Sequence, residues 1–154
     1  MLACWVLLHL GANPTWKERA IDEYKALVEK YTDTLSTEPL YKRLAAVPLS
    51  AWENELPSLD LIIRENLRMT APAAALRRNL VKELKVDGVV IKPGDFLLYS
   101  TGSLHMDPNI YRDPSKFDPE RYVKHRAEDR KEAFAFLGWG AGKLCPRQAV
   151  VEIY

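Results

Sequence analysis

A cysteine near the carboxyl end lies in a sequence that could present its sulfur to a metal. Cys145 follows the glycine-rich run Phe136-Leu-Gly-Trp-Gly-Ala-Gly-Lys-Leu144 and precedes Pro146. Proline favours the first turn of a helix, and the positive end of a helix dipole lowers the pKa of a neighbouring thiol. The pattern predicts a thiolate on a turn, and such a sulfur could hold iron.

A glutamate and two arginines form a second candidate cluster. Glu65 and Arg68 are three residues apart on an expected helix, and a surface pair of this kind contributes only about 0.2–0.5 kcal/mol. Arg121 lies further along, in the segment Phe117-Asp-Pro-Glu-Arg-Tyr122. A buried carboxylate between two guanidinium groups would join the helix to this segment by charge-assisted hydrogen bonds.

Composition and charge restrict the classes of function. The chain has 154 residues, of which 47% are hydrophobic and 28% charged, as in an ordinary globular domain with its own core. Its 22 basic and 21 acidic residues leave a net charge of +1, which makes a nucleic-acid partner unexpected. Cys4 and Cys145 lie at opposite ends, which argues against a disulfide framework or a zinc knuckle and favours a reducing, intracellular setting.

Helical spacing of apolar residues dominates the first part of the chain. Residues 2–10 are expected to be one end of a buried helix that begins inside a larger fold and ends at Gly11. Asn13-Pro14 predicts the start of a second helix. Residues 50–53 have the form of a capping box, and residues 59–69 predict a further helix. The apolar stripe of the second helix would be Ala20, Ile21, Tyr24, Leu27, Val28 and Tyr31.

The pattern changes to short strands after Pro72. Residues 84–86 and 89–91 flank Asp87-Gly88, a pair suited to a type I′ hairpin, and residues 96–100 predict a third strand. Prolines then forbid a long helix between 104 and 122 and predict an irregular, packed segment. The expected fold is therefore mainly α with a small antiparallel β-sheet (α+β), in a single incomplete domain over residues 1–154.

The ordered set of motifs resembles the C-terminal third of a cytochrome P450, the haem-thiolate monooxygenase family. The set consists of Glu65-x-x-Arg68, a hairpin, Phe117-x-Pro119-x-Arg121 and the glycine-rich cysteine loop. Residues 3–14 resemble the end of the family's long distal helix, and residues 105–117 resemble its approach to the meander. The run at 139–143 is similar to that of the sterol 14α-demethylase-like branch. The resemblance implies a partial cytochrome P450 fold.

The resemblance also implies roles for individual residues. Glu65, Arg68 and Arg121 would form the structural triad. Arg78, or Arg77 in its place, would contact a haem propionate. Lys143 and Cys145 would belong to the haem-binding loop, with Cys145 as the axial thiolate ligand of the iron.

The loop departs from the family's pattern around Cys145. Leu144 stands where a basic residue or histidine is usual, and Arg147 stands where a glycine is expected. Pro146 has no backbone N–H to offer the sulfur. The loop is also a few residues short, which leads to the hypothesis of a deletion or a mis-spliced gene there.

The implied function is insertion of one oxygen atom from dioxygen into a small lipophilic substrate, with haem as cofactor and an NADPH-dependent reductase as partner. The parent enzyme would belong to the endoplasmic reticulum membrane, whereas the isolated chain is expected to be inactive and to bind haem weakly at best. The alternative is a non-catalytic remnant or interaction fragment. A phosphate-binding loop at 138–143 fits less well, because Leu144 replaces the expected hydroxyl residue. No Ser-His-Asp arrangement is compelling among His9, His105 and His125.

Overall fold

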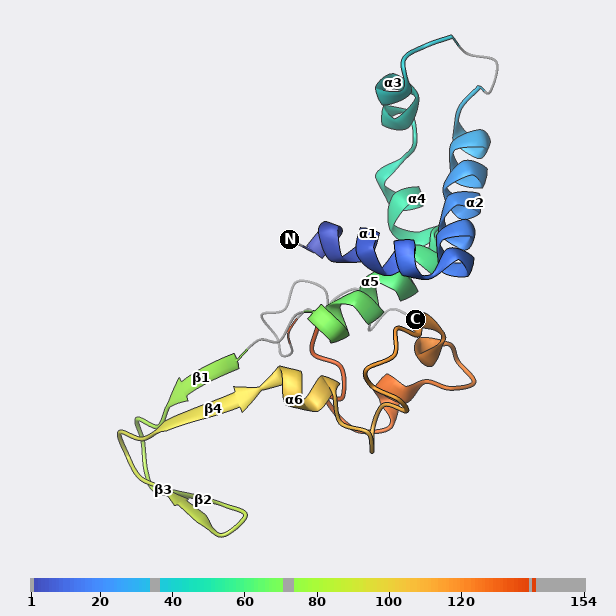
Figure 1. Cartoon of the computed structure of the whole chain (residues 1–154). Helices are drawn as coiled ribbons and strands as arrows, with labels where there is room; N and C mark the ends of the chain where they lie inside the picture. Colours follow the sequence, from blue (N-terminus) through green and yellow to red (C-terminus); the bar gives the residue numbers. More distant parts are fainter. Residues whose placement is uncertain (1, 34–36, 71–73, 139, 141–154) are drawn as a thin grey trace.

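Helices occupy most of the described residues before position 71. The computed structural model describes residues 2–33, 37–70, 74–138 and 140. α1 and α2 both pack against α5, and α3 and α4 return the chain alongside α2 (Figure 1). Prolines at the first positions of α2 and α5 explain where these two helices begin. The bounds are α1 (Leu2–Ala12), α2 (Pro14–Tyr31), α3 (Leu40–Ala45), α4 (Leu49–Asn54) and α5 (Pro57–Thr70).

Two expected helix starts differ in detail from the structure. Asn13 precedes α2 as expected, but its amide Nδ2 donates to the carbonyl of His9 at 2.8 Å and does not cap the helix. The capping box at 50–53 is wrong, because Pro48 occupies the N-cap position and Ser50 already lies inside α4. Pro48 is extended, with a ψ angle of 145°, so the helix begins at the next residue.

α5 lies between two apolar clusters. The first cluster contains Leu27, Val47, Ala51 and Leu56, with Leu59 of α5 packed against it. The second contains Ile110, Tyr111, Tyr122 and Ala135, with Leu61 of α5 packed against it. Of the stripe expected on α2, Leu27 and Val28 are buried, whereas Ile21 and Tyr24 remain exposed. Packing on both sides makes α5 the central element that positions its polar residues.

The strands form two separate antiparallel sheets, where the sequence predicted one. β2 (Leu84–Val86) pairs with β3 (Val89–Ile91), and positive φ angles of 47° at Asp87 and 81° at Gly88 fit the expected type I′ turn. β4 (Phe96–Ser100) pairs with β1 (Ala74–Arg78), not with the hairpin. The buried Asn79 explains this pairing, because its backbone exchanges hydrogen bonds with Gly94 and Asp95 and brings the two strands together.

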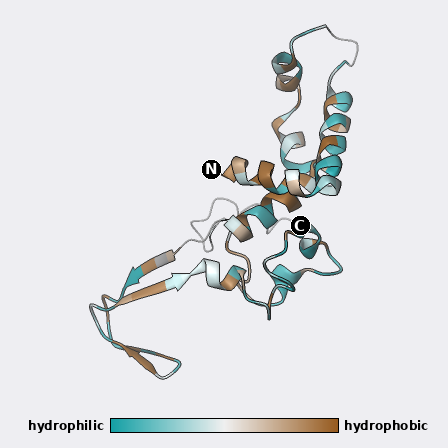
Figure 2. Ribbon diagram, viewed as in Figure 1, coloured by the Kyte–Doolittle hydropathy of each residue, from teal (hydrophilic) through white to brown (hydrophobic). Residues whose placement is uncertain are grey.

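The chain after β4 is largely irregular and returns to α5. A short helix, α6 (Thr101–His105), follows β4 directly. The 3-10 turn η1 (Pro119–Tyr122) lies within the expected irregular segment, and a second, η2 (Glu128–Arg130), follows it. Residues 133–137, which a phosphate-binding loop would need as a strand, form a turn and a bend at 133–135 followed by two residues without regular structure. The α+β fold class is confirmed. Figure 2 shows apolar residues along α1 and the strands, yet no helix in the described ranges is long and apolar enough to cross a membrane.

Candidate functional site

Glu65 lies at the centre of a buried ionic cluster on α5. Its carboxylate accepts two hydrogen bonds from Arg68, from Nε at 2.9 Å and Nη2 at 2.8 Å. It also accepts from Nε of Arg121 at 3.0 Å and from the hydroxyl of Tyr122 at 2.9 Å. The backbone N–H of Asp118 donates to the same carboxylate at 3.1 Å. The structure therefore brings together the three residues of the expected triad, and their side chains are fully buried.

Both guanidinium groups also donate hydrogen bonds to the backbone of the irregular segment. Arg68 donates to the carbonyls of His105 at 2.6 Å and Pro114 at 2.7 Å. Arg121 donates to the carbonyls of Arg112 at 3.0 Å and Lys116 at 3.1 Å. Five donors in a planar fork allow one arginine to satisfy several acceptors at once. The two side chains thus hold a segment with little regular structure against α5.

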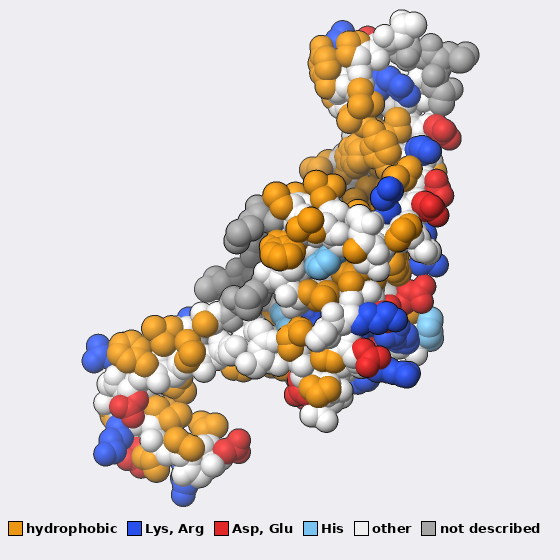
Figure 3. Space-filling view, in the orientation of Figure 1, with side chains coloured by type: hydrophobic (Ala, Val, Ile, Leu, Met, Phe, Trp, Pro, Cys, Tyr) orange, Lys and Arg blue, Asp and Glu red, His pale blue; other side chains and the backbone are white. Residues whose placement is uncertain are grey.

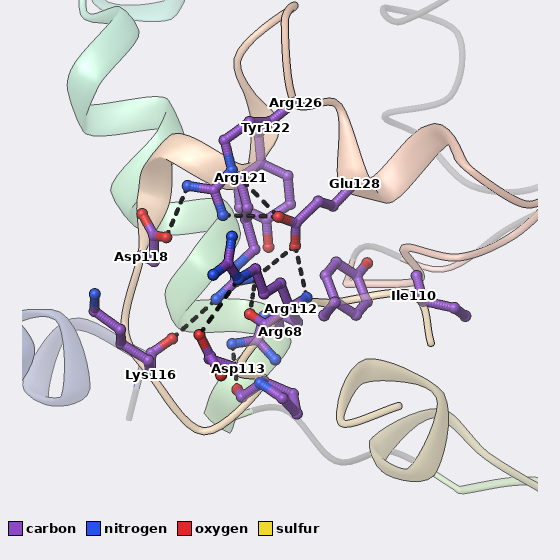
Figure 4. Close-up of polar contacts among 12 residues, drawn as sticks. Arg68, Ile110, Arg112, Asp113, Lys116, Asp118, Arg121, Tyr122, Arg126 and Glu128 are labelled. Atoms are coloured by element: carbon purple, nitrogen blue, oxygen red, sulfur yellow. Dashed lines mark hydrogen bonds and ion pairs between the residues drawn. The ribbon is translucent and has the colours of Figure 1, made fainter. Parts of the chain in front are cut away.

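A second carboxylate, Glu128, extends the cluster. Its Oε2 accepts from Nη1 of Arg121 at 2.6 Å, and its Oε1 accepts from Nη2 of Arg126 at 2.7 Å. Arg126 also donates to Asp118 at 2.8 Å (Figure 4). The backbone of Asp118 contacts Glu65, so the interactions form a closed ring. Three acidic and three basic side chains take part, which leaves the cluster electrically neutral.

Burial and charge shift the pKa values within this cluster. Burial alone would lower the pKa of Arg68, but the hydrogen bonds and charge of Glu65 raise it above its usual value. Burial, followed by the charge of Glu65, raises the pKa of Tyr122. Burial would raise the pKa of Glu128, yet hydrogen bonds from Arg126 and Arg121 lower it. Arg68 and Glu128 are therefore charged at neutral pH, and Tyr122 remains a hydrogen-bond donor.

Arg77 and Arg78 lie on β1, outside the cluster, and both are exposed. Nε of Arg78 donates to the carbonyl of Gly94 at 3.2 Å, and its guanidinium lies 5.5 Å from the ring centroid of Phe96. Within the described ranges, Arg77 donates to the neighbouring carbonyl of Leu76, at 2.9 Å. Lys143 and Cys145 lie outside the described residues. Among the described residues, no group of three or more His, Cys, Asp or Glu side chains could hold a metal ion.

Comparison of the chain with known protein families identifies its family. The family model described as Cytochrome P450 matches residues 2–146. The chain belongs to the cytochrome P450 family.

Several proteins of this family resemble the P450 chain. Cytochrome P450 monooxygenase dmxR5 of Cryptosporiopsis sp. (strain 8999) is 37% identical over 89% of this chain and 26% of its own length. Thromboxane-A synthase of Rattus norvegicus is 32% identical over 86% of this chain and 22% of its own length. The solved structure of a retinoic acid bound cyanobacterial CYP120A1 superposes with a TM-score of 0.69 at 27% identity, covering 92% of this chain and 29% of that one. The P450 chain thus spans about a quarter of the length of these relatives.

One face of the β1–β4 sheet fits the chemistry of haem, an apolar ring that carries two carboxylates. Leu76 lies opposite Leu98, and Arg78 lies opposite Phe96, so the four side chains share one face. Leu76, Leu98 and Phe96 are 54%, 68% and 65% exposed, and Figure 3 shows hydrophobic side chains gathered over these strands. Arg78 forms no ion pair with a described carboxylate. The residues present on this face therefore suit the cofactor of the family.

Several residues with clear structural roles in the P450 chain were not predicted from the sequence. Glu23 of α2 accepts from the backbone N–H of Ser58 at 2.8 Å and so caps α5. Glu128, Arg126 and Asp118 complete the ionic ring across an irregular segment, where no periodic spacing marks them. Between 118 and 129 the sequence has two acidic, then three basic and then two acidic residues, and this density of charge is its signal of the ring.

His105 is a buried histidine that sequence reasoning left without a role. Burial, with a smaller contribution from the charge of Arg68, lowers its pKa to about 4 from 6.5, and Glu65 opposes this shift. The imidazole is therefore neutral at pH 7.

Stability is expected to depend on pH through His105. Its pKa is lower in the folded chain, so between pH 6.5 and about 4 the unfolded chain binds more protons. Folded stability should fall as the pH is lowered through this window, with a slope of up to about 1.4 kcal/mol per pH unit from this group. Urea unfolding of the wild type and of His105→Gln at several pH values measures the difference in slope. Equal slopes in the two proteins would contradict the expectation, because all other titrating groups are common to both.

Proposed function

We propose that this chain forms the haem-binding part of a haem-thiolate monooxygenase. The observation that carries the proposal is the β1–β4 face. There the guanidinium of Arg78, which forms no ion pair with a described carboxylate, borders exposed apolar side chains. Membership of the cytochrome P450 family supports it. The ionic cluster around Glu65 acts as the scaffold that holds α5 and the returning segment in place, and it has no contact with substrate in this proposal.

The residues of the chain would divide the work of holding the cofactor. Arg78 would donate charge-assisted hydrogen bonds to a propionate, for which its planar fork is suited. The face formed by Leu76, Leu98 and Phe96 would exclude water from the edge of the ring. Cys145 would supply the axial thiolate, and Lys143 would lie in the same loop. The bound haem would supply dioxygen activation and insertion of one oxygen atom into a lipophilic organic substrate, with electrons from an NADPH-dependent reductase.

Titration of the full chain with haemin tests the contribution of Arg78. Arg78→Leu is expected to weaken haem binding by about tenfold or more, since a hydrogen bond to a charged group contributes about 1.5–3 kcal/mol. Arg77→Leu, a matched control from the same strand, should change the affinity by less than about twofold, a fraction of the energy of one such bond. Absorbance in the Soret region measures both. Equal effects of the two substitutions would contradict the assignment of Arg78.

A non-catalytic interaction fragment is the second candidate, because large apolar residues remain exposed on both sheets. Val89 and Leu98 are 64% and 68% exposed. Such surfaces bind partners as readily as they bind an apolar cofactor. A haemin titration of the wild-type chain that produces no Soret change would favour this candidate over the haem protein.

A further inference from the structure

His105 connects the ionic cluster to the segment that leads into the glycine-rich loop. Its backbone carbonyl accepts a hydrogen bond from Nη1 of Arg68 at 2.6 Å. Its ring nitrogen Nε2 accepts a hydrogen bond from the backbone N–H of Leu137, at 3.0 Å. The ring also stacks on Phe136, with centroids 5.5 Å apart and planes inclined by 20°. One fully buried residue thus contacts both parts.

The hydrogen bond from Leu137 fixes the tautomer of this histidine. A nitrogen that accepts a hydrogen bond carries no proton, so the proton of the neutral ring lies on Nδ1. Nδ1 is buried and has no hydrogen-bond partner in the described part of the chain. A buried donor without a partner destabilises the fold, and a phenylalanine would stack on Phe136 without that cost. What the histidine adds is an acceptor for the N–H of Leu137.

Gly138, the residue after Leu137, packs with little tolerance. A Cβ atom at Gly138 would clash with the ring of Phe136 and would lie 3.1 Å from Cβ of Leu67 on α5. Gly138 therefore lies close to both the Phe136 ring and α5, with no room for a side chain between them. His105 holds that ring by stacking and holds the next residue by a hydrogen bond.

We propose that His105 is a positioning residue that fixes residues 136–138, the start of the glycine-rich loop, against the Glu65–Arg68 cluster. Its consequence for haem binding rests on the proposed function, whereas its effect on the loop does not. At neutral pH the lowered pKa keeps the ring in the form that can accept from Leu137.

The wild-type chain itself tests the tautomer. Nitrogen-15 NMR of the full chain at pH 7 should show a protonated Nδ1 and an unprotonated Nε2 for His105. A proton on Nε2 would overturn the proposal without any substitution, so the test does not depend on whether a variant folds.

Two substitutions of similar polarity separate positioning from general stability. The amide of glutamine in His105→Gln reaches about as far as Nε2, whereas the shorter amide in His105→Asn reaches only as far as Nδ1. Hydrogen exchange of the Leu137 amide should accelerate by about tenfold in His105→Asn, relative to the Ile62 amide of α5, and by less than about threefold in His105→Gln. An unchanged Leu137-to-Ile62 ratio in His105→Asn would overturn the proposal.

Haemin titration of the same variants extends the test to the cofactor. Weaker binding in His105→Asn, with recovery in His105→Gln, would support positioning of the loop for haem. Wild-type affinity in His105→Asn, despite faster exchange at Leu137, would overturn the link to haem. If no variant, the wild type included, binds haem, the proposed function fails, while the exchange result still decides the role of His105.

Discussion

Replacing Glu65 by glutamine is expected to lower the free energy of unfolding by about 3–5 kcal/mol, because it removes the negative charge between two buried guanidinium groups. The amide of glutamine also brings its own donors to a site where five donors converge on the carboxylate. Urea unfolding followed by circular dichroism measures the loss.

Glu120→Gln provides the matched control for this substitution. Glu120 pairs with Arg19 at 3.1 Å, but the two side chains are 47% and 49% exposed. An exposed pair contributes at most about 1 kcal/mol, so this variant should unfold almost like the wild type. If Glu65→Gln were no more destabilising than Glu120→Gln, the buried cluster would not be the scaffold that we describe. Arg121→Lys should also lower the free energy of unfolding, because an ammonium group lacks the planar fork that contacts Glu65 and Glu128 together.

Replacing Cys145 by serine is expected to abolish the thiolate-type absorption of haem bound to this chain. The thiolate is the metal ligand, and a serine hydroxyl keeps its proton at neutral pH. The readout is the spectrum of the reduced carbon monoxide complex after titration with haemin. The effect should be complete, whereas loss of the Arg78 contact should only weaken binding.

Cys4→Ser is the matched control, since Cys4 is an exposed cysteine on α1. It should leave the spectrum unchanged. If the thiolate-type absorption remained in Cys145→Ser and disappeared in Cys4→Ser, the ligand would be Cys4. That result would refute the proposed role of Cys145. A spectrum without thiolate character in the wild type would refute it as well.

The sequence was most informative where local chemistry determines local structure. Asp87-Gly88 predicted the hairpin, because a type I′ turn needs two positive φ angles and these residues adopt them readily. Helical spacing placed Glu65 and Arg68 on one face of α5, and the ordered motifs added Arg121. These predictions depend on a few neighbouring residues or on a recognised pattern.

The sequence was least informative where contacts join distant segments without a period. The pairing of β4 with β1 depends on hydrogen bonds between Asn79 and residues 94 and 95. The sequence around Asn79 does not predict these hydrogen bonds. Glu128 reaches Arg121 across an irregular segment, so spacing alone could not assign the pair. The error at 50–53 has a local cause, because the competing proline at position 48 was the stronger signal for the start of α4.

The arginines of the cluster bind the backbone of the returning segment, so its exposed side chains are free to vary during evolution. Arg68 and Arg121 hold the carbonyl groups of residues 105, 112, 114 and 116, which every amino acid possesses. The exposed side chains of Arg112 and Lys116 can therefore be substituted in related proteins while the path of the backbone is preserved. Arg68 and Arg121 themselves cannot be substituted in this way. Related proteins can therefore differ widely in the surface of this region while they keep the same backbone path.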